Sequence, residues 1–88
     1  MSVAENVIVI GKKSVNDYVL AAILLFNEGH DEIVIKGKGA NIGKAVDVYN
    51  ALKDRLSDSL ELVSVTIDSE VLGNRIVPYI EIKVKRIL

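Results

Sequence analysis

Two stretches of the chain collect lysine side chains in a pattern that could bind phosphate groups. Residues 6–16 and 33–46 contain no aspartate or glutamate, although the 88-residue chain has a formal net charge of −1. The lysines within these stretches are Lys12, Lys13, Lys36, Lys38 and Lys44. Ammonium groups without competing carboxylates attract an anionic partner, and a nucleic-acid backbone supplies a row of anions. The pattern therefore favours a surface that follows phosphates over a pocket for one small ligand.

The glycine-rich segment at residues 36–44 fits neither of two common nucleotide-binding motifs. A Walker loop requires serine or threonine after its lysine, but Ala45 follows Lys44. A Rossmann turn requires the spacing G-x-G-x-x-G, whereas Gly39 and Gly43 are separated by three residues. The segment can instead supply backbone N–H groups at the start of a helix, which bind an anion together with nearby lysines.

Residue types suited to catalysis or metal binding are sparse. His30 is the single histidine, it has no serine or cysteine partner at a recognisable spacing, and the chain has no cysteine. Asp47 and Asp54 fit the polar face of a helix better than they fit a catalytic pair. We therefore expect no enzymatic activity, no metal site and no cofactor.

Hydrophobic periodicity predicts a single domain over residues 1–88, of the α/β class and the two-layer α+β type. Short β-branched runs indicate strands, apolar residues at helical spacing indicate helices, and later stretches alternate with a period of two. The expected elements are strands at 7–10 and 32–36, helices at 15–26 and 42–56, and strands around 63–67 and 80–84. The order βαβαββ predicts a mixed four-stranded sheet with two helices, in which the first three strands run parallel and the fourth antiparallel.

This order of elements predicts where the basic residues lie. Each lysine-rich stretch runs from a strand into a helix, so we expect the lysines in two loops at one end of the sheet. The residues Leu72-Gly73-Asn74-Arg75 favour a hairpin turn between the last two strands. That turn should bring Arg75 to the same end as the two loops.

The helix expected at residues 15–26 carries apolar residues on more than one face. Leu20 and Leu24 lie opposite its main apolar stripe, where a monomer normally presents polar groups. We expect these two leucines to contact another subunit. The alternative is that they are isolated surface leucines, which are common in monomers.

The sequence also indicates where the protein works. The start, Met-Ser-Val-Ala-Glu, lacks the features of an export signal, and the longest apolar run, at 18–26, is about half the length of a membrane span. We expect a cytoplasmic protein without a membrane partner.

Several segments resemble the Alba family of small archaeal chromatin and nucleic-acid-binding proteins. They are Val9-Ile10-Gly11-Lys12-Lys13, Tyr18-Val19-Leu20-Ala21-Ala22, Glu32 to Gly39, and Ile42-Gly43-Lys44-Ala45-Val46-Asp47. The resemblance covers nearly the whole chain and implies the fold of the C-terminal domain of translation initiation factor three. It also implies a dimer that binds double-stranded DNA, and often RNA, with little sequence preference, and that coats or compacts the chromosome.

The resemblance further implies roles for individual residues. Lys12 and Lys13 match the family's backbone-binding lysine pair, of which one member can be acetylated in some relatives. Lys38 and Lys44 match basic positions of the second loop. Arg75 lies in the hairpin that in this family reaches along the minor groove.

The chain also departs from the usual Alba pattern. Ala40 stands where many relatives carry arginine, and Leu56 stands where some carry an aromatic residue for contact between dimers. Asp68 and Glu70 flank the hairpin, and the net charge is negative where Alba proteins are usually basic. These features are similar to those of a divergent second Alba paralogue. The alternative function is therefore a subunit that pairs with a basic paralogue or joins a ribonucleoprotein, with weak nucleic-acid affinity of its own.

Overall fold

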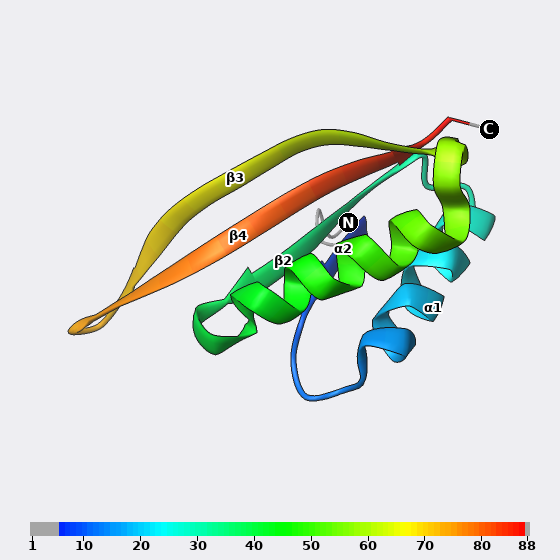
Figure 1. The fold of residues 1–88 in the computed structure, drawn as a ribbon. Helices are drawn as coiled ribbons and strands as arrows, with labels where there is room; N and C mark the ends of the chain where they lie inside the picture. Colours follow the sequence, from blue (N-terminus) through cyan, green and yellow to red (C-terminus); the bar gives the residue numbers. More distant parts are fainter. Residues whose placement is uncertain (1–5, 88) are drawn as a thin grey trace.

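The computed structural model describes residues 6–87, so the expectation about the first five residues lies outside the described part of the chain. The strands are β1 (Val7–Val9), β2 (Glu32–Lys38), β3 (Leu60–Leu72) and β4 (Arg75–Arg86). The helices are α1 (Val15–Asn27) and α2 (Ile42–Leu56), and short 3-10 turns at Gly39–Asn41 and Ser57–Ser59 flank α2. The order βαβαββ and the two-layer α+β class are as the sequence predicted (Figure 1).

The four strands form one mixed sheet. Their order across the sheet is β1, β2, β4, β3, with β1 parallel to β2 and with β4 antiparallel to both β2 and β3. Strands β1, β2 and β3 therefore run in one direction and β4 in the other, as predicted. The strand-to-helix connections and the hairpin turn at Gly73 and Asn74 consequently lie toward the same end of the sheet (Figure 1).

Helix α1 begins where its sequence contains a capping box. The Asp17 backbone N–H donates to the Ser14 hydroxyl at 3.2 Å, and the Ser14 N–H donates to the Asp17 carboxylate at 3.2 Å. This reciprocal pair satisfies N–H groups that the first helical turn leaves without partners. The start of the helix is thereby fixed directly after the loop that carries Lys12 and Lys13.

Both helices pack on one face of the sheet and form the hydrophobic core with it. Ile33 and Ile35 of β2 and Val48 and Leu52 of α2 are completely buried. Alternate residues of β2 and β4 point into this core, and the residues between them lie on the opposite, helix-free face of the sheet. Among residues 6–87, no helix is long and apolar enough to cross a membrane.

The hairpin of β3 and β4 extends past the rest of the sheet. Lys38, the last residue of β2, pairs with Tyr79, and Tyr79 pairs with Asp68. Residues 69–78 therefore pair only with each other, and we call them the arm. In Figure 1 the arm points away from both helices.

Gly37 allows α2 to approach β2 closely, which gives a test of the packing. A Cβ atom at this position would lie 2.8 Å from the Ala45 Cβ and would also meet the backbone of Asn41. Gly37→Ala should lower the free energy of unfolding by about 1 to 3 kcal/mol, as overpacking typically does. Gly43→Ala is the control, because a Cβ there meets nothing within 4 Å. Chemical denaturation measures the free energy of unfolding of both variants. Equal changes in the two would show that the close packing of α2 on Gly37 does not contribute to stability.

Candidate nucleic-acid interface

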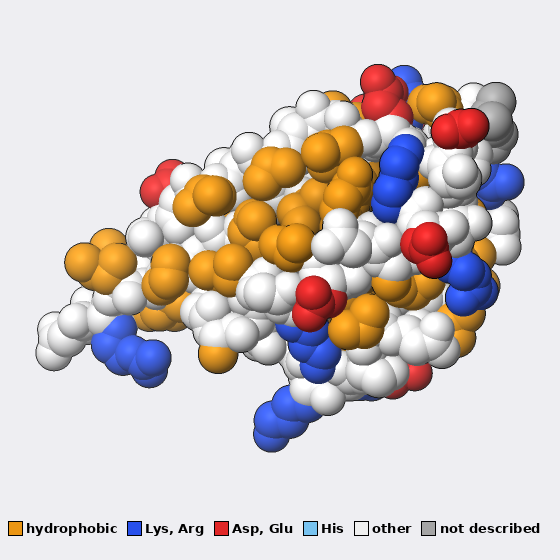
Figure 2. All heavy atoms as spheres, viewed as in Figure 1, with side chains coloured by type: hydrophobic (Ala, Val, Ile, Leu, Met, Phe, Trp, Pro, Cys, Tyr) orange, Lys and Arg blue, Asp and Glu red, His pale blue; other side chains and the backbone are white. Residues whose placement is uncertain are grey.

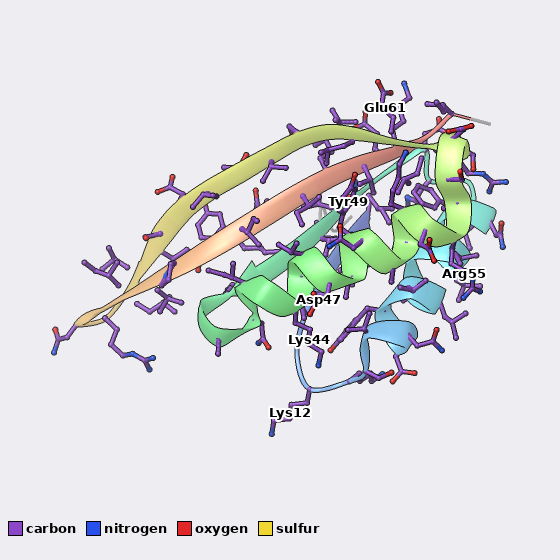
Figure 3. The ribbon with its side chains drawn as sticks, viewed as in Figure 1. Lys12, Lys44, Asp47, Tyr49, Arg55 and Glu61 are labelled. Carbon is purple, nitrogen blue, oxygen red and sulfur yellow. The ribbon has the colours of Figure 1, made fainter. Side chains whose placement is uncertain are left out.

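The loop between β1 and α1 presents Lys12 and Lys13 on a fixed backbone. Both side chains are exposed, and Figure 3 shows Lys12 pointing away from the protein. The backbone N–H groups of Gly11 and Lys13 donate to the buried Tyr18 hydroxyl, at 2.7 Å and 3.2 Å. Tyr18 lies in the first turn of α1, so the helix determines the shape of the loop. The backbone of the loop is therefore ordered, while the side chains of both lysines stay exposed to solvent.

Lys44 connects the start of α2 to the same loop. Its ammonium donates to the Gly11 carbonyl oxygen at 2.9 Å and lies 5.7 Å from the centre of the Tyr18 ring. Lys44 is the third residue of α2, within the helix expected at residues 42–56, so it lies just after the strand-to-helix loop and not in it. An ammonium has three N–H donors, so two stay available to a phosphate after the bond to Gly11. Lys12, Lys13 and Lys44 therefore form one basic group, which we call the loop site.

The two helix starts differ in what they offer an anion. The capping box of α1 already uses its first N–H groups and places the carboxylate of Asp17 there. At α2, Asn41 makes no side-chain capping bond, and the first turn has no acidic residue. The first turn of α2, which carries Lys44 of the loop site, therefore adds the positive end of the helix dipole without a carboxylate of its own.

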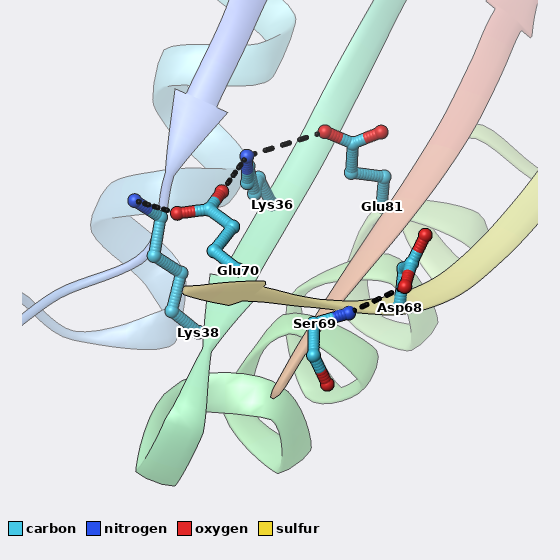
Figure 4. Close-up of polar contacts among 6 residues, drawn as sticks. All are labelled: Lys36, Lys38, Asp68, Ser69, Glu70 and Glu81. Carbon is cyan, nitrogen blue, oxygen red and sulfur yellow. Dashed lines mark hydrogen bonds and ion pairs between the residues drawn. The ribbon is translucent and has the colours of Figure 1, made fainter. Parts of the chain in front are cut away.

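Lys36 and Lys38 lie elsewhere, on the helix-free face of β2. Lys36 ends the strand that was expected at residues 32–36, and β2 continues to Lys38, so the expected loop position of Lys38 is wrong. The Lys36 ammonium lies 2.8 Å from one carboxylate oxygen of Glu70, and the Lys38 ammonium lies 3.3 Å from the other (Figure 4). Lys36 also lies 3.4 Å from the Glu81 carboxylate and 4.5 Å from the centre of the Tyr79 ring. Glu70 therefore bridges the two lysines.

This arrangement shifts the titration of its members. Hydrogen bonds from Lys36 and then Lys38 hold the pKa of Glu70 below its ordinary value. The hydrogen bond to Glu70 raises the pKa of Lys36, against the opposite effect of its partial burial. Both charges are therefore favoured at neutral pH.

Arg75 lies apart from both groups. It is the first residue of β4, at the tip of the arm, and its side chain is exposed. The structure thus divides the predicted site residues into the loop site, the bridged pair of Lys36 and Lys38, and Arg75. The acidic residues Asp58 and Glu61 lie near the other end of the sheet, as does Arg55, the next-to-last residue of α2 (Figure 3).

Similarity to known proteins identifies the family of this chain. The Alba family model matches residues 6–69. The chain belongs to the Alba family. It is 53% identical over 83 residues to DNA/RNA-binding protein Alba 2 of Saccharolobus solfataricus, covering 93% of each chain. It is 41% identical over 87 residues to DNA/RNA-binding protein Alba of Methanocella arvoryzae, covering 93% of this chain and 91% of the relative.

Solved Alba structures have the same fold. Alba from Thermoplasma volcanium superposes with a TM-score of 0.83 at 36% identity, covering 92% of this chain and all of that one. ALBA1 from Trypanosoma brucei superposes with a TM-score of 0.84 at 26% identity, covering 94% of this chain and 70% of that one. The two archaeal relatives are named DNA/RNA-binding proteins. Within residues 6–87 of this Alba protein, no three His, Asp or Glu side chains are grouped as metal ligands would be.

Sequence reasoning missed an exposed apolar surface on this Alba protein. Val65 and Ile67 of β3 alternate as predicted, but 49% and 76% of their surfaces are exposed. They pair with Ile82 and Ile80, which point toward the helices, so they lie on the helix side where no helix covers them. The surface, which we call the apolar strip, runs along β3 and β4 beside α2 (Figure 2). Its exposed members on β3 and β4 are Leu62, Val65, Ile67, Val71 and Ile76.

The expected subunit-contact residues are found in two environments. Leu20 and Leu24 are 47% and 59% exposed on α1. Leu56 is half-buried and packs against the core. The apolar strip is a larger set of exposed residues than the two leucines of α1.

The Tyr18 hydroxyl should be required for the structure of the lysine loop. Tyr18→Phe removes the acceptor of two partly buried N–H groups, which should cost about 1 to 3 kcal/mol of stability. Hydrogen exchange at Gly11 and Lys13 should become faster than in the unchanged protein. Tyr49→Phe is the matched control, because the Tyr49 hydroxyl bonds to no other residue within 6–87. Unchanged exchange at Gly11 would contradict the assignment.

The ion pairs of Glu70 should be visible in its titration. Because its pKa is lowered in the folded state, the pairs stabilise the fold above the ordinary pKa of glutamate, and the stabilisation is lost as pH falls through the lowered value. Lys36→Ala should raise the Glu70 pKa toward its ordinary value, as measured by carbon NMR of the side-chain carboxyl. Lys85→Ala should leave it unchanged. An ordinary Glu70 pKa in the unchanged protein would refute the ion pairs.

Proposed function

We propose that this Alba protein binds double-stranded DNA and RNA without sequence specificity, as a dimer that coats or compacts the nucleic acid. The observation that carries the proposal is the loop site, where exposed Lys12 and Lys13 and half-buried Lys44 meet the uncapped start of α2. Residues 6–16 and 33–46, which contain the lysines of the loop site, include no aspartate or glutamate. The names of the archaeal relatives support the same partners.

The proposed contacts are made to phosphates and not to base edges. Lysine ammonium groups act as point charges and carry no sequence information when they bind the backbone. Arg75, at the tip of the arm, would reach a second segment of the same duplex beyond the body of the protein. These contacts would make the association non-specific and sensitive to salt, and we propose the chromosome in the cytoplasm as its target. The exposed Lys12 and Lys13 are also the side chains that an acetylating enzyme could reach.

The dimer would form through the apolar strip. Monomers rarely expose a contiguous apolar surface of this kind, and a second copy offers a matching uncharged surface about a twofold axis. Nucleic acid would not cover the strip, because none of its residues is charged. Leu20 and Leu24 would form a separate and smaller contact, and half-buried Leu56 on α2 would add less to any contact.

A second candidate is a subunit that tunes a basic Alba paralogue or a ribonucleoprotein. The observation that favours it is the bridging of Lys36 and Lys38 by Glu70, which neutralises cations that would otherwise contribute to affinity. Gel shifts of this protein alone and mixed with a basic paralogue separate the two functions. Strong binding alone supports the first, and binding only in the mixture supports the second.

The loop site should contribute more to binding than an equal charge elsewhere. Lys12→Ala with Lys13→Ala should weaken binding to a random duplex by about one to two powers of ten. The slope of log affinity against log salt concentration should become less negative by about two units. Fluorescence anisotropy in a series of salt concentrations measures both quantities.

The matched control for this prediction is Arg55→Ala with Lys85→Ala, which removes two exposed charges at the other end of the protein. Lys53 is unsuitable as a control, because its ammonium donates to the carbonyl oxygens of Ser57 and Leu60 at 3.0 and 2.8 Å. An equal loss in the control pair would show that position does not matter.

The apolar strip should control the oligomeric state. Ile67→Lys places a charge at a site that is 76% exposed in the monomer, so the fold should persist while the dimer dissociates. Leu24→Lys is the matched change on α1, where 59% of the leucine is exposed. Sedimentation equilibrium at micromolar concentration should find monomers for Ile67→Lys and dimers for Leu24→Lys. The reverse result would move the dimer to α1, and an unchanged monomeric protein would refute the dimer.

A further inference from the structure

Glu70 occupies the position in which a phosphate would meet Lys36 and Lys38. Its two carboxylate oxygens each contact one lysine, at 2.8 Å and 3.3 Å, and it comes from the arm and not from the body of the sheet (Figure 4). A carboxylate that bridges two ammonium groups satisfies the same donors that a phosphate diester would use. Because the lysines cannot bind both anions fully, the two compete.

The contact is more enclosed than an ordinary surface ion pair. The side chains of Lys36 and Glu70 are only 18% and 28% exposed. Exposed ion pairs contribute little to the stability of a protein because water and salt screen their charges. Partial exclusion of solvent weakens this screening and so strengthens the attraction between the two charges. Lys36 is also held by Glu81 and by the Tyr79 ring, so its ammonium stays in place for whichever anion binds it.

Asp68 makes clear that the contact is specific to Glu70. It lies on the same strand, two residues earlier, and carries the same charge. Its carboxylate accepts from the Ser69 N–H at 2.7 Å and contacts no lysine within residues 6–87 (Figure 4). The acidic character of β3 alone therefore does not produce the bridge.

We propose that Glu70 is an intramolecular competitor of nucleic-acid phosphate, which closes the arm over Lys36 and Lys38 and limits the affinity of the protein. The proposal rests on the proposed function, because it assumes that phosphates reach this face. Nucleic acid that engages Lys36 and Lys38 displaces Glu70, and the arm is then released from β2. The loop site, which Glu70 does not contact, binds in either state.

The first test compares Glu70→Gln with Asp68→Asn, which removes the same charge from the same face. Glu70→Gln should strengthen binding to a random duplex about five- to tenfold, since two lysines become available to phosphates. For the same reason, the slope of log affinity against log salt concentration should become more negative by about one to two units. Asp68→Asn should change the affinity less than about twofold, as expected for an exposed charge. Equal gains in the two variants would overturn the proposal, because only the net charge would then matter.

A double-mutant cycle assigns the gain to the two lysines. When Lys36→Ala and Lys38→Ala are already present, Glu70→Gln should no longer strengthen binding. An undiminished gain in that background would overturn the proposal. Thermal unfolding of each variant, followed by circular dichroism, verifies that the compared proteins are folded.

A second readout needs no nucleic acid. Glu70 keeps the Lys36 ammonium protonated and covered, so Glu70→Gln should accelerate its acylation by acetic anhydride, relative to that of Lys85, as measured by peptide mass spectrometry. Unchanged acylation would overturn the bridge itself. If acylation accelerates and the unchanged protein binds duplex but Glu70→Gln binds no better, the competition is refuted. If neither protein binds DNA or RNA while acylation accelerates, the proposed function fails and the bridge stands as a structural contact only.

Discussion

The helices of this Alba protein are too short to cover its longest strands, and much of its surface chemistry follows from that mismatch. Helix α2 has 15 residues and β3 has 13. At about 1.5 Å per helical residue and about 3.3 Å per strand residue, the strand is roughly twice as long as the helix. The part of the hairpin beyond the helices must therefore be covered by something else or stay exposed. One face of this part carries the distal end of the apolar strip, Val71 and Ile76, and the other carries Glu70.

The elements and their order could be predicted from the sequence because their signals are local. The capping box of Ser14 and Asp17 and the turn at Gly73 each depend on residues within four positions, and the structure contains both. Strand direction follows from the order of the elements. The expected loop position of Lys12 and Lys13 was also correct. These two residues directly precede the cap at Ser14, so the local sequence alone keeps them close to the start of α1.

The features that were missed depend on contacts between distant segments. Lys36 and Glu70 are 34 positions apart, and their contact requires the register of β2, β4 and β3 together. A strand that extends two residues further than expected moved Lys38 from a loop onto a sheet face. Similarly, the alternation at Val65 and Ile67 identified a face of β3, but periodicity carries no information about what covers that face.

The basic residues therefore differ in what a phosphate gains from them. In the proposed function, a phosphate at Lys12 and Lys13 would meet exposed ammonium groups, and counterions condensed on the nucleic acid would be released, which would make the contact strongly dependent on salt. At Lys36 and Lys38 a phosphate exchanges with a carboxylate that is already bound, so the net gain is smaller and fewer ions are released. Because Glu70 and Arg75 lie on the same arm, displacing Glu70 also releases the segment that carries Arg75. Phosphate binding at Lys36 and Lys38 of β2 and release of the arm would then be coupled, and each would favour the other by the same free energy.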